Sequence, residues 1–303
     1  MELLQLRYFC LVAKRGNITR VAEELMISQP SLSKTIKNLE KEVGVPLFDR
    51  SPGKITLNQY GEVFYDSIQR GLMKIDDGLR MVNDMSEKSM HVTLLASAAT
   101  GILADLLFSF QTAHPGILLT VERLQHNLQH PTIRYDIAIS ESIGIPSGHA
   151  SIPLFTEQLG IVVPPGHPLS TLSSLKIIQT RPYGFVTYPR GRNTRTHLDN
   201  LCAAAGFSPN IIYEIDHTSM YRGCMHKGLS LLSFSSYYYQ YRDAVKFVPI
   251  TDPGSTRTLC ISWDATKYLS SAAKIFQAHC VDCFRDLEKI QQQFLQNLNE
   301  IKK

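Results

Sequence analysis

The sequence predicts a small helical domain with a β-hairpin at the N-terminus, followed by one long helix and a larger α/β domain. The first 58 residues contain short amphipathic helices and a Pro-Gly turn between apolar segments. Residues 59 to 88 lack proline and repeat apolar residues in heptads. Beyond residue 89, strand-like and helix-like segments alternate. These observations predict three domains, at residues 1–58, 59–88 and 89–303.

The strongest local pattern is a pair of short helices joined by a tight turn before residue 28. Ser28 can cap the second helix, Pro30 fits its first turn, and Gly44 can end it. Its apolar residues recur on one face: Leu32, Ile36, Leu39 and Val43. The opposite face is polar and basic. Two helices of this kind are typical of a helix-turn-helix that reads duplex DNA.

A β-hairpin is predicted directly after this pair, with a turn at residues 51–54 and a returning strand at 55–57. Basic side chains on such a hairpin suit a phosphate backbone. We therefore predict a DNA-binding surface formed by Ser28, Gln29, Ser31, Ser33, Lys34, Lys37, Arg50 and Lys54. The alternative is a helical bundle whose basic face is simply solvated. The turn, the helix pair and the hairpin together favour DNA binding.

These residues resemble the N-terminal signature of LysR-type transcriptional regulators. The matching positions are Leu6, Phe9, Val12, Ala13, Gly16, Ala22, Leu25, residues 28–33 (Ser-Gln-Pro-Ser-Leu-Ser), Leu39, Glu40, Gly44, residues 47–50 (Leu-Phe-Asp-Arg) and Gly61. The chain departs from the family pattern at Val21, Lys34-Thr35 and Asn58, where alanine, Arg-Gln and threonine are usual. These departures bear on base preference and leave the winged helix-turn-helix fold unchanged. The resemblance implies a regulator that binds operator DNA.

The alternating segments after residue 89 predict an α/β fold with largely parallel sheets. We expect strands at 91–96, 118–124, 135–140, 159–163, 183–187, 211–215, 229–234 and 259–263, and helices at 102–110, 194–205, 219–227 and from 268 onward. The order resembles the two-lobed, periplasmic-binding-protein-like effector domain of LysR-type regulators, except between residues 125 and 134, where the resemblance is weak. It implies lobe I at about 89–162 and 265–303, lobe II at about 163–264, and a small-molecule effector between them.

Ligands of open α/β sheets bind beyond the carboxyl ends of the strands. The turns at these ends carry hydroxyl groups and helix N-termini, which favour a carboxylate or another small anion. We predict effector contacts from Ser97, Ala99, Thr100, Ser140, Arg192, Asn193, Thr194, Thr218 and Ser219. Each residue could instead be an ordinary helix cap, and Arg195, a second candidate cation, could pair with Asp199. The convergence of these residues on one cleft is implied by the resemblance and not by their spacing.

Two long helical patterns predict packing against other parts of the assembly. The heptad positions form a seam of Tyr65, Ile68, Leu72, Ile75, Leu79 and Val82. This helix could lie on its own domain, but both flanking regions look complete, so we predict that a second chain buries the seam in a homodimer or a dimer of dimers. The last helix continues its apolar stripe through Leu287, Ile290, Phe294, Leu298 and Ile301. We predict that this tail is ordered and packs on another lobe or subunit.

Composition excludes several classes of protein. The 303 residues carry 31 Lys plus Arg and 27 Asp plus Glu, a net charge of +4 that is too small by itself to indicate nucleic acid. No apolar run approaches the roughly 18 residues of a membrane span, and basic residues interrupt any signal peptide, so we expect a cytoplasmic protein. Six irregularly spaced cysteines do not predict a disulfide framework.

The sequence predicts neither a cofactor, nor a metal site, nor an enzyme. Cys280 and Cys283 form a lone Cys-x-x-Cys on an apolar helix face, which is more typical of buried thiols than of a zinc site. No nucleophile–base pair or phosphate loop stands out. Two alternatives stay open: a redox-sensing regulator of the same architecture that uses Cys202 and Cys224, and a solute-binding or enzymatic α/β protein. The second would leave the N-terminal motif unexplained.

Overall fold

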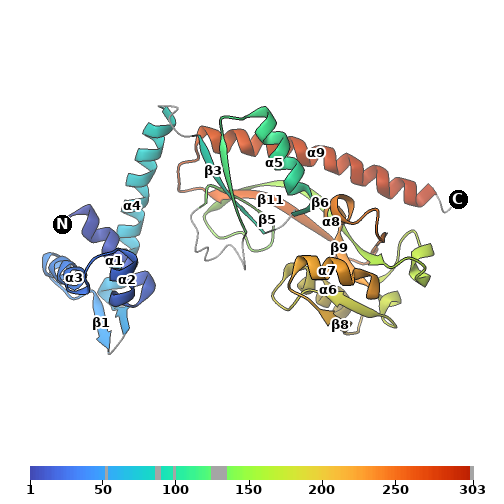
Figure 1. The fold of residues 1–303 in the computed structure, drawn as a ribbon, viewed down its shortest axis with the longest axis horizontal. Helices are drawn as coiled ribbons and strands as arrows, with labels where there is room; N and C mark the ends of the chain where they lie inside the picture. Colours follow the sequence, from blue (N-terminus) through green and yellow to red (C-terminus); the bar gives the residue numbers. More distant parts are fainter. Residues whose placement is uncertain (52–53, 86–89, 98–99, 124–134, 301–303) are drawn as a thin grey trace. The chain divides into compact units, whose positions relative to one another are not determined.

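The computed structural model describes residues 1–303 except 52–53, 86–89, 98–99, 124–134 and 301–303. It contains two compact units, Met1–Ser86 and Glu87–Lys303 (Figure 1). Ala99 and Ile301 of the sequence analysis lie outside the described residues, as does the side chain of Thr100. No helix in the described parts is long and apolar enough to span a membrane.

The first unit is a winged helix-turn-helix. Its elements are α1 (Leu3–Arg15), α2 (Ile18–Glu24), α3 (Gln29–Val43), β1 (Phe48–Ser51), β2 (Lys54–Leu57) and α4 (Gln59–Met85). The helix ends follow the sequence signals: Ser28 caps α3, and Gly44 ends it in the left-handed conformation. The strands β1 and β2 pair antiparallel as the predicted hairpin. Phe9 is fully buried at the centre and packs its ring on Phe48 and Phe64.

The start of helix α4 lies very close to the backbone before the hairpin. A Cβ atom on Gly61 would lie 2.0 Å from the carbonyl oxygen of Leu47, so only glycine allows α4 to approach the hairpin this closely. Further along, Tyr65, Ile68 and Leu72 pack against the core of their own unit. The first half of the predicted seam therefore follows the alternative interpretation, in which the helix lies on its own domain.

The second unit contains a seven-stranded mixed sheet in the order β10-β6-β11-β5-β3-β4, with β9 also paired to β6. These strands are β3 (His91–Ala96), β4 (Leu118–Arg123), β5 (Ile137–Glu141), β6 (His149–Val163), β9 (Ser230–Ser233), β10 (Lys246–Pro249) and β11 (Thr256–Asp264). A separate parallel pair consists of β7 (Gly184–Thr187) and β8 (Asn210–Glu214). The helices are α5 (Thr100–Ala113), α6 (Asn193–Ala204), α7 (Thr218–Cys224), α8 (Phe234–Gln240) and α9 (Ser271–Glu300), with short 3-10 helices at Pro168–Thr171, Ile177–Thr180 and Met225–Lys227.

The long strand β6 joins two lobes. It pairs with β11 up to Gln158 and with β9 and β10 from Leu159 onward. Lobe I contains β3, β4, β5, β11 and the first part of β6, and lobe II contains β7, β8, β9, β10 and the rest of β6. The return crossing lies between β10 and β11, so Thr256–Asp264 belongs to lobe I and not, as the sequence suggested, to lobe II.

The prediction of largely parallel sheets was wrong. Among the described strands, β3–β4, β3–β5 and β7–β8 pair in parallel, whereas β6 and β11 run antiparallel to all their described partners. The reason is topological, because the chain leaves lobe I along β6 and, after it returns from lobe II, runs back along β6 in the opposite direction as β11. The α/β class and the two lobes were predicted correctly.

Helix α9 confirms the prediction of an ordered C-terminal tail. It packs along β6 and β3 on the side that α5 also covers (Figure 1). Leu287 is buried, and Phe294 packs its ring on Phe234 and Tyr237 of α8 and on Phe247 of β10. The tail therefore reaches from lobe I to the elements that line the crossing between the lobes.

Candidate functional site

Helix α3 presents a polar face opposite its buried stripe. Leu32, Ile36 and Leu39 are fully buried, while Gln29, Lys34 and Lys37 are exposed. The hydroxyl oxygen of Ser28 accepts the backbone N–H of Ser31 at 3.3 Å, and the amide of Gln29 donates to the Ser33 hydroxyl at 2.9 Å. These bonds hold the donors and acceptors of the first turn in place on the solvent side. Such a face can enter the major groove of DNA and read base edges.

The turn before α3 is closed by a strained residue. Met26 has φ 53° and is 94% exposed, and the following N–H of Ile27 donates to the carbonyl of Ala22 at 3.0 Å. A left-handed conformation is uncommon for a residue other than glycine, asparagine or aspartate. It turns the chain tightly enough for α2 and α3 to form the helix-turn-helix.

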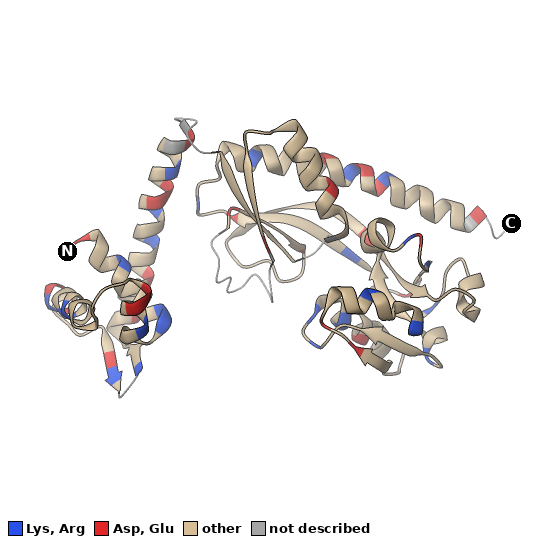
Figure 2. Ribbon diagram, in the orientation of Figure 1, with Lys and Arg blue, Asp and Glu red and all other residues tan. Residues whose placement is uncertain are grey.

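The hairpin is attached to α3 by one carboxylate. Glu40 accepts the backbone N–H of Leu47 at 2.9 Å, and its other oxygen accepts from the guanidinium of Arg50 at 3.0 Å. Arg50, predicted to bind phosphate, therefore also fixes the hairpin to the helix. Lys54 is exposed at the start of β2, and the blue segments of the hairpin in Figure 2 show that both strands carry a basic residue.

The predicted effector residues lie at the ends of strands and the starts of helices. Ser97 follows β3 and donates its N–H to the carbonyl of Ile139 at 3.0 Å. Ser140 is buried near the end of β5, and its hydroxyl donates to the Glu141 carbonyl at 3.2 Å. In lobe II, exposed side chains begin α6 and α7, namely Asn193, Thr218 and Ser219, and Thr194 is half-buried. The positions therefore agree with helix starts, but these facts do not assign ligand contacts to them.

The two arginines considered as cations for an anion are already paired. Arg192 donates through Nε to Asp216 at 2.9 Å. Arg195 is buried and donates to Asp199 at 2.9 Å and to Glu214 at 2.7 Å. Arg195 thus follows the alternative interpretation, in which it pairs with Asp199. Both guanidinium groups are therefore already neutralised by carboxylates of the protein.

A buried ionic cluster that the sequence analysis did not predict joins three strands of the sheet. Arg257 on β11 donates to Glu157 on β6 at 2.7 Å and to Glu141 on β5 at 2.6 Å. Its third contact is the Ser233 hydroxyl at 3.0 Å, where β9 ends, and Glu157 also accepts the Ser235 N–H at 3.0 Å. A buried charge is tolerated when it is paired and hydrogen-bonded in this way.

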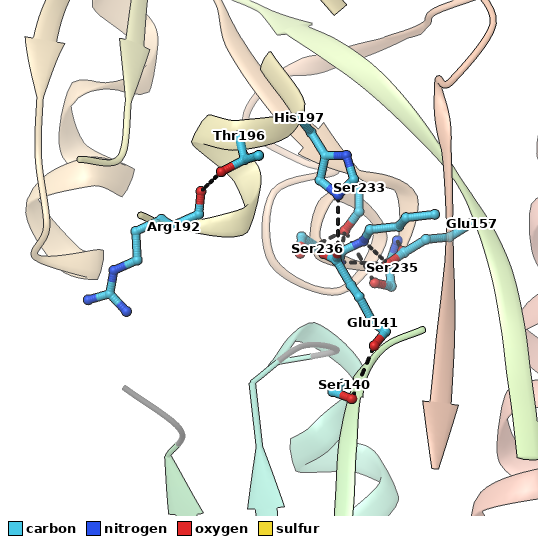
Figure 3. Close-up of polar contacts among 10 residues, drawn as sticks. Ser140, Glu141, Glu157, Arg192, Thr196, His197, Ser233, Ser235 and Ser236 are labelled. Atoms are coloured by element: carbon cyan, nitrogen blue, oxygen red, sulfur yellow. Dashed lines mark hydrogen bonds and ion pairs between the residues drawn. The ribbon is translucent and has the colours of Figure 1, made fainter. Parts of the chain in front are cut away.

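Glu141 is the member of this cluster that meets lobe II. Its second oxygen lies 2.9 Å from Nε2 of His197 on α6 (Figure 3). Burial alone would raise the pKa of Glu141, but the hydrogen bond from His197 and the charge of Arg257 outweigh it and lower that pKa to about 2. Figure 3 shows Arg192 pointing away from this group. The cluster of Glu141, Glu157, Arg257 and His197, called the ionic cluster below, is therefore a charged contact between the lobes.

The cysteines provide little support for redox chemistry. All six are free thiols. Cys202 is fully buried, and this burial together with the charge of Asp199 raises its pKa to about 12. Burial also raises the pKa of Cys280 and Cys283. A thiol with a raised pKa contains little of the reactive thiolate. In the described part of the chain, no group of three or more His, Cys, Asp or Glu residues could hold a metal ion.

Comparison with known proteins covers almost the whole chain. A family model described as "Bacterial regulatory helix-turn-helix protein, lysR family" matches residues 3–62, and one described as "LysR substrate binding domain" matches residues 84–285. The transcriptional dual regulator GltC of Bacillus subtilis is 27% identical over 300 residues, covering 96% of this chain and 100% of its own.

Two solved structures have the same fold. Full-length OxyR C199D from Pseudomonas aeruginosa has a TM-score of 0.65 at 20% identity, covering 93% of this chain and 98% of that one. Full-length CbnR in complex with its target DNA has a TM-score of 0.53 at 20% identity, covering 94% and 100%. The likeness extends over both units.

Proposed function

The chain belongs to the LysR family of transcriptional regulators, and from this premise we propose that it binds operator DNA through α3 and the β1–β2 hairpin. The observation that carries the proposal is the face of α3, where exposed Gln29 is hydrogen-bonded to half-buried Ser33 beside the exposed Lys34 and Lys37. CbnR, whose structure includes its target DNA, supports the same use of this fold. Because its ligand is DNA, we place the protein in the cytoplasm, and we propose a binding function without a catalytic one.

We assign different roles to the two kinds of predicted contact. Gln29 and Ser33 reach base edges, while Ser28, Ser31, Lys34, Lys37, Arg50 and Lys54 hold the phosphate backbone or the helix that approaches it. Arg50 contributes partly through Glu40, so Lys54 is the better residue for testing a phosphate contact.

A binding-site selection from random duplex DNA with the full chain would supply an operator for the test. Replacing Gln29 with alanine should weaken binding to that operator by about 1–3 kcal/mol and change binding to random duplex little. Replacing Lys54 with alanine should weaken binding to both duplexes similarly and flatten the salt dependence. A band-shift titration measures the affinity of wild type and of each variant for both duplexes. Equal losses by Gln29→Ala on operator and random DNA would remove Gln29 from base recognition.

We further propose that the protein acts as a homodimer or a dimer of dimers. Ile75, Leu79 and Val82 are exposed apolar residues on α4 and continue the stripe whose first half packs on the DNA-binding unit. Burying this second half against another chain would remove apolar area from water. Two copies would also present two α3 helices to two half-sites.

A small-molecule effector between lobes I and II completes the proposal. A ligand can shift the lobe arrangement only if it binds one arrangement more tightly than another. Polar groups from both lobes meet in this region, namely Glu141 from lobe I and His197 from lobe II. The arginine pairing observed above removes the main reason for expecting a carboxylate.

A further inference from the structure

We propose that the effector site selects a cationic hydrogen-bond donor, an ammonium or amidinium group, which takes the place of His197 on Glu141. This inference rests on the proposed effector site between the lobes and concerns the chemistry of its ligand. It starts from the one side-chain contact in Figure 3 that joins α6 to β5, the Nε2 to Oε2 distance of 2.9 Å between His197 and Glu141.

The position of this contact matters because it lies away from the hinge. The chain crosses between the lobes within β6 at Gln158–Leu159, and again between β10 and β11. Arg257, Glu157 and Ser233 lie beside these crossings, so their bonds can persist when the lobes rotate. His197 belongs to α6, whose core contacts are in lobe II, so its bond to Glu141 must change in any such rotation.

The charge of the ionic cluster favours a cation at this position. Glu141 and Glu157 carry two negative charges, and Arg257 carries one positive charge. These three side chains sum to −1 at the position that His197 contacts, in a region where Glu141 is 5% exposed and Glu157 fully buried. A net charge in such surroundings is costly, and a cationic ligand at the position of His197 would cancel it.

The nearby arginines do not favour an anionic ligand. Arg192 is paired with Asp216, and Arg195 with Asp199 and Glu214. A carboxylate ligand would have to break one of these pairs, whereas an ammonium ligand only has to displace a histidine. Displacement would also free α6 from lobe I, which couples binding to the arrangement of the lobes.

The test uses the full chain at about pH 8. Butylammonium, butanoate and butanol are matched in chain length and are titrated by calorimetry. Wild type should bind butylammonium at least about tenfold more tightly than butanoate or butanol, because hydrogen bonds between charged groups exceed neutral ones. Hydrogen exchange on residues 193–204 should become faster when butylammonium binds, since the bond from His197 is lost.

Two variants and one control separate the site from general effects. Glu141→Gln keeps the shape and removes the charge, so butylammonium should bind at least about tenfold more weakly. His197→Phe keeps a ring and removes the competing donor, so butylammonium should bind more tightly; this variant carries the test if Glu141→Gln fails to fold. Glu288→Gln, an exposed site on α9, should behave as wild type.

Tighter binding of butanoate, undiminished butylammonium binding in Glu141→Gln, or no butylammonium binding in wild type would each overturn the inference. Operator binding by the same wild-type preparation is measured in parallel. Butanoate binding with normal operator binding would leave the proposed regulator and its effector site standing and remove only the cation preference. Loss of operator binding in wild type would instead contradict the proposed function.

Discussion

Replacing Gln291 with alanine should lower the free energy of unfolding of the second unit by about 1–3 kcal/mol. Gln291 lies on α9, is 7% exposed, and binds the β6 backbone through both ends of its amide. Its Oε1 accepts the N–H of Gln158 at 2.9 Å, and its Nε2 donates to the carbonyl of Thr156 at 3.1 Å. Each neutral hydrogen bond contributes about 1 kcal/mol net, and a partly buried N–H left without an acceptor costs about 1–3 kcal/mol.

Urea unfolding of the full chain measures this effect. The single tryptophan, Trp263, lies on β11 opposite Ala150 of β6, so its fluorescence reports on the strands that Gln291 holds. Gln293→Ala is the matched control, because Gln293 is exposed two residues further along the same helix and should change stability by less than about 0.5 kcal/mol. Equal midpoints and slopes for the two variants would refute the idea that α9 stabilises the crossing strand through this amide.

Three further predictions follow from the same structure. Met26→Asn should raise the free energy of unfolding of the first unit by about 0.5–1 kcal/mol, because asparagine tolerates φ 53° better and removal of the exposed methionine side chain loses little packing. Thermal melts measure this change, and a lower melting temperature for the variant would show that Met26 makes an essential contact. Ile75→Glu should reduce dimerisation and operator binding together, by placing a charge in an apolar contact, and a variant that still sediments as a dimer would locate the interface elsewhere. Folding lowers the pKa of Glu141 from about 4.5 to about 2, so the ionised carboxylate stabilises the fold at pH values above 4.5. Wild type should therefore lose stability as the pH falls from about 5 toward 2. In urea titrations at several pH values, Glu141→Gln should lose about 3 kcal/mol less over that range.

The N-terminal unit could be predicted closely because its signals are local. Ser28 and Gly44 bound α3 as expected, and the apolar stripe of Leu32, Ile36 and Leu39 is its buried face. The seam on α4 was less certain for a physical reason. An apolar stripe shows that something covers it, but the stripe itself does not distinguish a neighbouring helix of the same unit from a second chain.

The α/β unit was predicted less completely. The sequence suggested that β6 begins at Leu159, whereas it begins at His149. The first part of this strand contains Pro153, and proline in a strand usually marks an edge or a bulge. The structure has such an irregularity here, because the register between β6 and β11 shifts between Leu259 and Cys260, next to Pro153. Helix α8 was not anticipated either. Its sequence, FSSYYYQ, is rich in aromatic residues that favour strands in isolation, and packing against α5 and β6 outweighs that preference.

Charge pairing was the part of the site that local patterns could not supply. The sequence places Arg192 at a helix start, where it could bind an anion, but in the fold it pairs with Asp216, which is 24 positions away. Glu157 and Arg257 are 100 positions apart and meet only because β6 and β11 are neighbours in the sheet. Local patterns therefore place polar groups at helix starts while leaving the sign of the local charge undetermined. Because that sign decides whether an anion or a cation is favoured, the ligand class has to be argued from the folded arrangement of Glu141 and its partners.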